Sequence, residues 1–271
     1  MTSAELAARF HHLHQAPGPT LVLPNCWDVV TARLIEQAGA PALATTSAGV
    51  AWSLGAVDGH QLDRGLMVEH LRRITTAVQV PVTCDIEGGY GEGDDALAET
   101  VRLVVEAGAV GVNLEDSTRS GELRDPADAA HRVAVVREAA DQAGLDLYLN
   151  ARTDTYLSGS ADLDETVARA HAFLQAGASG IFVPGTADLD IIEDLTSAIP
   201  APVNILVGPA SPPVAELAAA GVRRVSTGSS LAGAVLGHVS RAARELLGHG
   251  TYGELADPYT WAELNDLYAE R

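Results

Sequence analysis

The sequence predicts an α/β fold, a (βα)8 or TIM barrel with additional C-terminal helices, and we expect residues 1–271 to form one domain. Short apolar runs alternate with amphipathic stretches, and several of these stretches end in Ala-Gly just before the next run. The runs are continuous in Val, Ile and Leu, which is typical of parallel strands covered by helices. The length of 271 residues suits one barrel plus terminal additions.

The elements follow one another in a regular order. Residues 1–10 have the apolar spacing of an amphipathic helix rather than a signal peptide. The predicted strands are 21–25, 42–47, 82–87, 111–116, 147–153, 180–185, 203–207 and 224–228, and the clearest intervening helices are 95–107, 127–143, 164–176 and 212–220. A doubly wound sheet is the alternative, but Leu23-Pro-Asn-Cys-Trp27 stands where such a sheet usually carries a glycine-rich nucleotide loop.

The C-terminal segment is unusually aromatic. A helix at about 230–247 is followed by residues 251–270, which contain Tyr252, Tyr259, Trp261, Leu264, Leu267 and Tyr268. Apolar side chains at this spacing are suited to burial against another surface. We expect 248–271 to form a helical tail that packs on a partner subunit, with packing on its own barrel as the alternative.

The composition excludes several functions. The sequence contains no lysine, and all 17 basic residues are arginines. Schiff-base and pyridoxal-phosphate chemistry and a Walker-type phosphate site, which need a lysine, are therefore excluded. A net charge of −19 argues against nucleic acid or an anionic membrane as partner. No segment has the length and apolarity of a membrane span, and we expect a cytoplasmic protein that acts on a small molecule.

The cysteines and histidines offer little catalytic signal. Cys26 and Cys84 form neither a disulfide framework nor a zinc motif. Cys84 alternates with Asp85, so its side chain should point into the layer between barrel and helices. Cys26 could border a site just beyond the first strand. Among the nine histidines, His60 alone lies in a loop that could approach the mouth of the barrel.

The most informative segment is Val82-Thr-Cys-Asp-Ile-Glu-Gly-Gly-Tyr-Gly91. Asp85 and Glu87 end an apolar strand and share one face of it, because side chains two apart point the same way. Two neighbouring anions are costly unless a cation or proton neutralises them. Oxygen ligands alone favour Mg²⁺ or Mn²⁺ over zinc. The alternative is that both carboxylates accept hydrogen bonds from backbone amides of the turn.

Two later strands also finish in charged residues, within Gly111-Val-Asn-Leu-Glu-Asp116 and Leu147-Tyr-Leu-Asn-Ala-Arg-Thr-Asp154. Chemistry in such barrels gathers at the carboxyl ends of the strands. Glu115 and Arg152 are therefore expected to face Asp85 and Glu87. Asp116 should face the other side of its strand. For Arg152, binding an anionic substrate competes with a structural ion pair to Glu115 or Asp154, and Asp154 could also orient the guanidinium.

Six motifs occur in order at these strand ends: Leu23-Pro-Asn25, Thr45-Thr-Ser-Ala-Gly-Val50, Gly55 with Asp58, Asp85-Ile-Glu-Gly-Gly-Tyr-Gly91, Asn113-Leu-Glu-Asp116 and Asn150-Ala-Arg-Thr-Asp154. Over about residues 20–240 the chain resembles the isocitrate lyase/phosphoenolpyruvate mutase superfamily. The resemblance implies an enzyme that depends on Mg²⁺, with Mn²⁺ as an alternative, and that forms the enolate of pyruvate or a related 2-oxo acid.

The resemblance also implies roles for individual residues. Asp85, Glu87 and Glu115 would hold the metal largely through water, with Asp58 as an accessory carboxylate. Arg152 would bind the substrate carboxylate, and backbone amides of Thr46, Ser47 and Ala48 would bind it from the other side. Arg152, Asp58 and Glu115 are thus the expected catalytic residues, and Asp85 also contacts the substrate. In the superfamily the last helices are exchanged between subunits, which implies a homodimer or homotetramer.

The sequence departs from the superfamily where its subclasses are decided. The loop Ser117-Thr-Arg-Ser-Gly-Glu-Leu-Arg124 lacks the cysteine, histidine or lysine that acts there in the known subclasses, and Glu122 is either a base or a solvated residue. Small residues near Gly185 and in 228–233 replace the anchors for bulkier acids. These changes favour a small 2-oxo or compact 2-hydroxy acid.

Asn204, at the end of the seventh predicted strand, is either a substrate hydrogen-bond donor or a turn former. We expect a lyase that cleaves a C–C bond. The alternatives are a phosphoenolpyruvate or phosphonopyruvate mutase or hydrolase that acts on P–C bonds, and a 2-oxo acid binding protein without activity.

Overall fold

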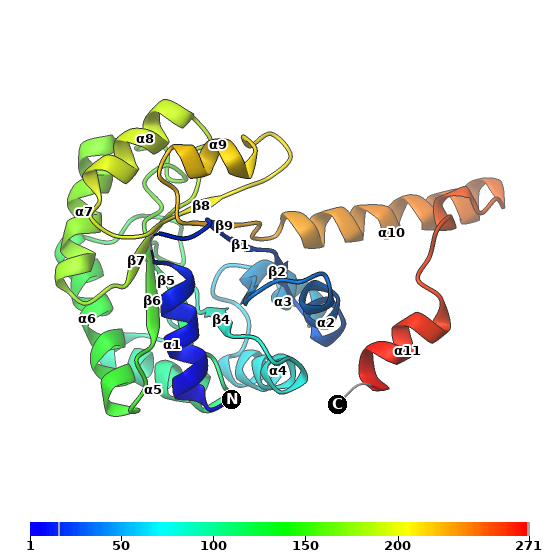
Figure 1. Cartoon of the computed structure of the whole chain (residues 1–271), viewed down its shortest axis with the longest axis horizontal. Coiled ribbons are helices and arrows are strands. Elements are labelled where there is room, and N and C mark those ends of the chain that lie inside the picture. Colours follow the sequence, from blue (N-terminus) through cyan, green and yellow to red (C-terminus); the bar gives the residue numbers. More distant parts are fainter. Residues whose placement is uncertain (16, 270–271) are drawn as a thin grey trace.

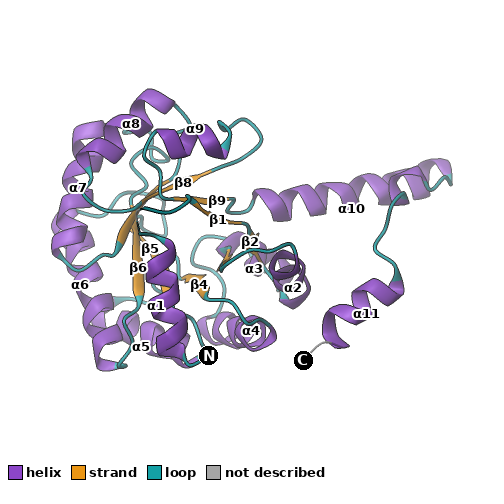
Figure 2. Ribbon diagram, viewed as in Figure 1, coloured by secondary structure: helices purple, strands orange, loops and turns teal. Residues whose placement is uncertain are grey.

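The predicted barrel is confirmed. A computed structural model describes residues 1–15 and 17–269, and its nine parallel strands form a nearly closed barrel surrounded by helices (Figures 1 and 2). The strands are β1 (Leu21–Leu23), β2 (Asn25–Cys26), β3 (Leu43–Thr45), β4 (Val82–Asp85), β5 (Gly111–Glu115), β6 (Tyr148–Arg152), β7 (Gly180–Val183), β8 (Val203–Leu206) and β9 (Arg224–Ser226).

The first predicted strand, 21–25, is divided in two. β1 pairs with β9 and β2 pairs with β3, so the chain passes from one side of the barrel seam to the other at Pro24. Proline has no N–H for a strand ladder. The Asn25 side chain bridges the seam instead, since its Oδ1 accepts hydrogen bonds from the N–H groups of Thr227 (2.9 Å) and Gly228 (2.8 Å). Its Nδ2 donates to the Thr45 carbonyl (2.8 Å).

Helices alternate with the strands as the sequence pattern predicts. They are α1 (Ser3–Leu13), α2 (Val29–Gln37), α3 (Ser47–Ser53), α4 (Arg64–Ala77), α5 (Gly93–Glu106), α6 (Pro126–Gln142), α7 (Leu163–Gln175), α8 (Leu189–Ala198), α9 (Val214–Ala219), α10 (Ser230–His249) and α11 (Trp261–Ala269), with a 3-10 turn at Gly253–Leu255. The predicted strand 42–47 ends at Thr45, because the chain turns there into α3. This short helix brings the backbone of 46–48 over the mouth of the barrel.

Aromatic side chains fill the amino-terminal end of the barrel. The Phe10 ring meets the Tyr148 ring edge-on at 5.3 Å, and the His14 ring stacks on Tyr148 at 3.9 Å and meets Phe10 edge-on at 4.8 Å. A Cβ at Gly180 would lie 2.4 Å from the Tyr148 hydroxyl, so a residue without a side chain is needed there. Burial is the main cause that lowers the pKa of His14 to about 3. The filled end leaves the carboxyl ends of the strands as the open side.

Both cysteines are buried. Cys84 faces away from the barrel axis and lies 3.8 Å from the Met67 sulfur of α4, as its alternation with Asp85 predicts. Burial raises the pKa of Cys26 and of Cys84 to about 12. A thiol with such a pKa stays protonated near neutral pH and is a poor nucleophile. Cys26, which could border a site from its place in the sequence, is therefore poorly suited to act as a nucleophile.

The two C-terminal helices leave the body of the barrel. α10 projects outward, and α11 returns toward α2 (Figure 1). Arg33 of α2 donates through Nε to the Leu267 carbonyl at 2.7 Å. Leu247 and Trp261 are 87% and 82% exposed. Residues 270–271 of the expected tail lie outside the described part of the chain. Within residues 1–15 and 17–269, no helix combines the length and apolarity that crossing a bilayer requires.

Candidate functional site

A pocket of about 160 Å³ opens at the carboxyl ends of the strands. Six residues expected at the site line it: Thr46, Ser47, Ala48, Asp58, Asp85 and Arg152. Further lining residues come from other strand ends: Asn25, Asn113, Phe182, Pro184, Leu206, Ser226, Gly228 and Ser229. Pockets for drug-sized ligands are typically about 300–1,000 Å³, so this one suits a smaller molecule.

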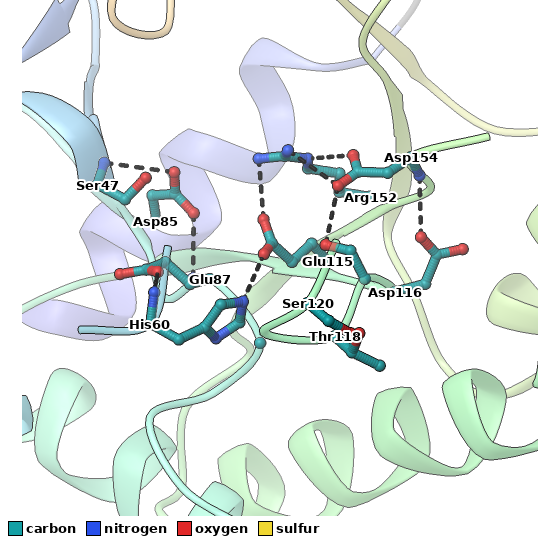
Figure 3. A network of polar contacts seen from close by, with 12 residues as sticks. Ser47, His60, Asp85, Glu87, Glu115, Asp116, Thr118, Ser120, Arg152 and Asp154 are labelled. Atoms are coloured by element: carbon teal, nitrogen blue, oxygen red, sulfur yellow. Dashed lines mark hydrogen bonds and ion pairs between the residues drawn. The ribbon is translucent and has the colours of Figure 1, made fainter. Parts of the chain in front are cut away.

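Asp85 lies beside Ser47 at one side of the polar network in Figure 3. Its carboxylate accepts hydrogen bonds from the N–H groups of Ser47 (3.4 Å) and Glu87 (3.2 Å). Burial raises the pKa of Asp85 to about 6, and the negative charges of Glu115 and Glu87 add to this, while Arg152 opposes it. The site therefore holds more negative charge than its own arginine balances.

Glu87 and Glu115 are joined by His60, which comes from the loop before α4 (Figure 3). The His60 N–H donates to the Glu87 carboxylate, and His60 Nε2 lies 2.9 Å from Glu115 Oε1. His60 and Glu87 both have positive φ, at 61° and 50°, a backbone strain that tends to persist at functional sites. A Cβ at Gly88 would lie 2.5 Å from the His60 ring, so the ring can occupy this position only because residue 88 has no side chain.

His60 is the site residue that the sequence did not assign, although its loop position was a signal. Its hydrogen bond with Glu115 is the main cause that raises the pKa of the imidazole, against an opposing effect of burial. Burial alone would raise the pKa of Glu115, but the contacts with His60 and Arg152 outweigh it and lower the pKa. Glu115 is therefore held as an anion between two partners.

Arg152 is fixed by carboxylates on two sides. Its Nη1 lies 3.0 Å from Glu115 Oε2, while Nε and Nη2 donate to the two oxygens of Asp154 at 2.6 and 3.0 Å. The guanidinium carbon also lies 5.7 Å from the centre of the Phe182 ring. Burial would lower the pKa of Arg152, but Glu115 and Asp154 outweigh it. The expected ion pairs are thus present, and they orient a side chain that also lines the pocket.

Asp116 has the structural role expected from its place on the far side of β5. Its Oδ1 accepts from the Asp154 N–H at 2.9 Å, and its Oδ2 lies 3.3 Å from Nη1 of Arg169 in α7. Ser117 Oγ donates to Asp154 Oδ2 at 3.0 Å. These contacts tie the ends of β5 and β6 together and hold Asp154 against Arg152.

The predicted metal site can be compared with this geometry. Within the described residues, no three His, Cys, Asp or Glu side chains form a ready-made chelating cluster. Asp85 and Asp58 line the pocket, whereas Glu87 and Glu115 lie behind it and contact His60. An all-oxygen donor set with excess negative charge fits an ion that keeps several of its waters, as Mg²⁺ does. The ligand set Asp85, Glu87 and Glu115 remains a prediction.

Asn204 lies deeper than expected. Its Oδ1 accepts from Ser226 Oγ at 3.3 Å, and its Nδ2 has no partner among the described residues. Ser226 lines the pocket and Asn204 does not. Asn204 therefore supports a lining residue, and its contact with a substrate remains a prediction.

The loop after β5 is a small hairpin with internal contacts. Ser117 and Leu123 form an antiparallel bridge, and the Thr118 N–H donates to the Glu122 carbonyl at 2.8 Å. Ser120 Oγ donates to the Glu122 carboxylate at 3.1 Å. Glu122 is thus engaged within the loop, and the choice between a general base and a solvated residue remains a prediction. A wider cleft of about 730 Å³ beside His60 is lined by Arg119 and Arg124 of this loop.

Comparisons with known proteins show which chains this one is similar to. The family described as phosphoenolpyruvate phosphomutase matches residues 10–247. An uncharacterized protein of Mycobacterium tuberculosis H37Rv is 41% identical over 236 residues, which cover 87% of each chain. The crystal structure of a candidate lyase/mutase from Burkholderia cenocepacia J2315 has a TM-score of 0.92 and 40% identity, covering 98% of this chain and 97% of the other. Oxaloacetate decarboxylase 2 of Pseudomonas fluorescens is 30% identical over 232 residues, covering 80% of this chain and 76% of the relative.

Proposed function

Because the chain belongs to the phosphoenolpyruvate phosphomutase family of enzymes, we propose that it is a Mg²⁺-dependent lyase that cleaves a C–C bond in a small 2-oxo or 2-hydroxy carboxylate. The observation that carries the proposal is Arg152, held in a fixed plane by Glu115 and Asp154 at the wall of a pocket of about 160 Å³ that also contains Asp85. A planar guanidinium beside an anion-rich site suits a carboxylate that also binds a cation.

Each residue of the site has a separate role in this proposal. Arg152 binds the substrate carboxylate, and the backbone amides at 46–48 approach it from the start of α3. Asp85 and Asp58 would hold Mg²⁺ from the pocket side, with Glu87 and Glu115 acting through water. When bound, Mg²⁺ would stabilise negative charge on the 2-oxo oxygen as the C–C bond breaks and a pyruvate-type enolate forms. Phe182 and Pro184 cover part of the pocket with apolar surface and keep water away from that charge.

A turnover assay with a panel of acids tests this function. Oxaloacetate, 2-hydroxy diacids, phosphonopyruvate and phosphoenolpyruvate would each be incubated with Mg²⁺ and with a chelator, and products would be identified by NMR. We expect C–C cleavage of a diacid only when the metal is present. Turnover of phosphonopyruvate or phosphoenolpyruvate alone would favour the P–C alternative. Binding without turnover of any compound would favour a 2-oxo acid binding protein, which the loop at 117–125, without a known acid or base, also suits.

We predict that residues 117–125 close over the ligand and that Arg119 or Arg124 then approaches it. Arg119 is exposed, and the one ion pair of Arg124 within residues 1–15 and 17–269 is with the half-exposed Asp128 at 3.2 Å. The Arg124 Nε is buried there without a hydrogen-bond partner. Replacing each with alanine should reduce kcat/KM by roughly tenfold, the size of one hydrogen bond to a charged group, with Mg²⁺ affinity preserved. Steady-state kinetics and metal titration measure the two effects. Arg102→Ala on the outer face of α5 is the control, and unchanged kinetics in both loop variants would leave the loop without a catalytic role.

We also propose that the tail is exchanged within a homodimer or homotetramer. Leu247 of α10 and Trp261 of α11 are the most exposed large apolar side chains of these two helices, and a partner subunit would cover them. Deleting residues 250–271 should give a species of lower mass by light scattering. Leu247→Asp should do the same without removing the contact of α11 with Arg33, whereas Glu245→Asp serves as a control on the same helix. An unchanged mass in both altered proteins would reject the exchange.

A further inference from the structure

Beneath the pocket, three polar side chains meet inside the barrel. Asn113 of β5 is opposite Asn150 in the ladder with β6, and Arg224 reaches them from β9. Asn113 Oδ1 accepts two hydrogen bonds, from Asn150 Nδ2 at 2.9 Å and from Arg224 Nη2 at 3.3 Å. All three residues are at most 5% exposed. The network therefore lies in a dry interior, where each polar contact matters more than in water.

The arginine determines which way the Asn113 amide points. A guanidinium has N–H donors and no acceptor, so the amide atom beside Arg224 must be the oxygen. The same oxygen then requires Asn150 to present its NH₂ group. This leaves Asn150 Oδ1 without a partner among the described residues, which is unfavourable for a buried acceptor. The orientation of both amides thus follows from one donor-only group.

The consequence is at the pocket. Asn113 lines it together with Asp85 and Arg152. With its oxygen committed to two donors, the Nδ2 group of Asn113 is what remains for a ligand. This nitrogen has no hydrogen-bond partner in residues 1–15 and 17–269, and it is not among the fully enclosed polar atoms without a partner.

Burying the Arg224 side chain costs free energy. It is 1% exposed, no carboxylate pairs with it in the described part of the chain, and its Nε and Nη1 have no partners there. Burial is the main cause that lowers the pKa of Arg224 to about 10, so the group remains charged near neutral pH. The negative charge of Asp85 opposes this effect from a distance. A buried cation without a carboxylate in direct contact is usually destabilising, which argues for a role beyond stability.

We propose that Asn113 donates a hydrogen bond from Nδ2 to an oxygen of the bound carboxylate ligand, and that Arg224 is a positioning residue that fixes this donor orientation. The ligand class rests on the function proposed above, whereas the orientation rests on the network alone. The pair supplies a second contact for an anion on β5, next to Arg152 on the neighbouring strand β6. The small residues at Gly185 and 228–233 do not supply such a contact.

A double-mutant cycle with oxalate as the probe tests the proposal. Oxalate binding to the Mg²⁺-loaded protein would be measured by calorimetry for the wild type, Asn113→Leu, Arg224→Met and the double variant. Asn113→Leu should weaken oxalate binding roughly tenfold to a hundredfold, the range for a hydrogen bond to a charged group, without weakening Mg²⁺ binding. Arg224→Met should weaken it in the wild type but not in the Asn113→Leu background, because it acts through Asn113. Equal oxalate affinity of Asn113→Leu and wild type would overturn the donor role. An equal loss from Arg224→Met in both backgrounds would overturn the positioning role.

A second measurement needs no ligand and separates this proposal from the proposed function. The side-chain amide signals of Asn113 in an NMR spectrum of the free protein can be assigned by their loss in Asn113→Leu. They should shift or broaden in Arg224→Met, since the amide is then free to turn. Unchanged signals would contradict the positioning role even if oxalate does not bind to the wild type. If the signals shift in Arg224→Met but the wild type binds no oxalate, the result would instead count against the ligand class.

Discussion

Replacing Asp85 with alanine is expected to abolish metal-dependent turnover, with a loss of about a thousandfold or more in kcat/KM. Asp85 is the carboxylate that faces the pocket from the end of β4, and burial and its acidic neighbours raise its pKa to about 6. Removing it takes away the group best placed to hold a cation there. The fold should persist, because the hydrogen bonds that the Asp85 side chain accepts from the described residues come from two backbone amides alone.

Two further variants make this prediction specific. Asp85→Asn keeps the shape but loses the charge, so it should reduce Mg²⁺ affinity nearly as much as alanine does. Asp141→Ala removes an exposed carboxylate from α6, remote from the pocket, and should leave kinetics unchanged. Kinetics at increasing Mg²⁺ and thermal unfolding would be measured for all three. Full activity of Asp85→Ala in metal-supplemented assays would mean that the proposed site is wrong.

Arg152→Lys is expected to raise KM for the carboxylate substrate and to lower kcat/KM by about a hundredfold. Lysine keeps the positive charge but cannot present two parallel N–H groups to Asp154 or a planar edge to a carboxylate. Arg152→Met should in addition lower the free energy of unfolding by about 3–5 kcal/mol, because Glu115 and Asp154 would be left buried without their cation. Kinetics and chemical denaturation measure the two effects separately.

The comparison of these two variants distinguishes substrate binding from a purely structural ion pair. Arg102→Lys on the surface of α5 is the matched control, since its partners Glu99 and Glu106 are exposed and screened by solvent. If Arg152→Lys changed stability but left KM at the wild-type value, Arg152 would be a structural residue and the proposed substrate contact would be excluded.

Much of the site could be predicted because its signals are local. Each strand that carries Asp85, Glu115 or Arg152 is a short, mainly apolar run, and a parallel barrel brings the carboxyl ends of such runs together. A substrate contact and a structural ion pair are compatible interpretations of Arg152, because its ion pairs with Glu115 and Asp154 hold it at the pocket wall.

The features that the sequence did not reveal depend on pairing between distant residues. The division of the first strand at Pro24 follows from which neighbours β1 and β2 have across the barrel seam. His60 reaches Glu115 only because its backbone adopts a positive φ and Gly88 leaves room for its ring. Arg224 lies in a three-residue strand beside Arg223, which contacts the backbone of Gln15 and Gly18 instead. Successive side chains of a strand point to opposite faces, so the two arginines can be told apart only when the position of the strand is known.

Diffraction from crystals grown with Mn²⁺ and oxalate would test the central claim most directly, because the anomalous signal of manganese locates the ion independently of the protein contacts. The account predicts one manganese peak in the pocket beside Asp85, with oxalate bound to the ion and one of its carboxylates on Arg152. Glu87 and Glu115 should reach the ion through water. A pocket without a manganese peak at saturating Mn²⁺, or oxalate bound away from Arg152, would contradict the account.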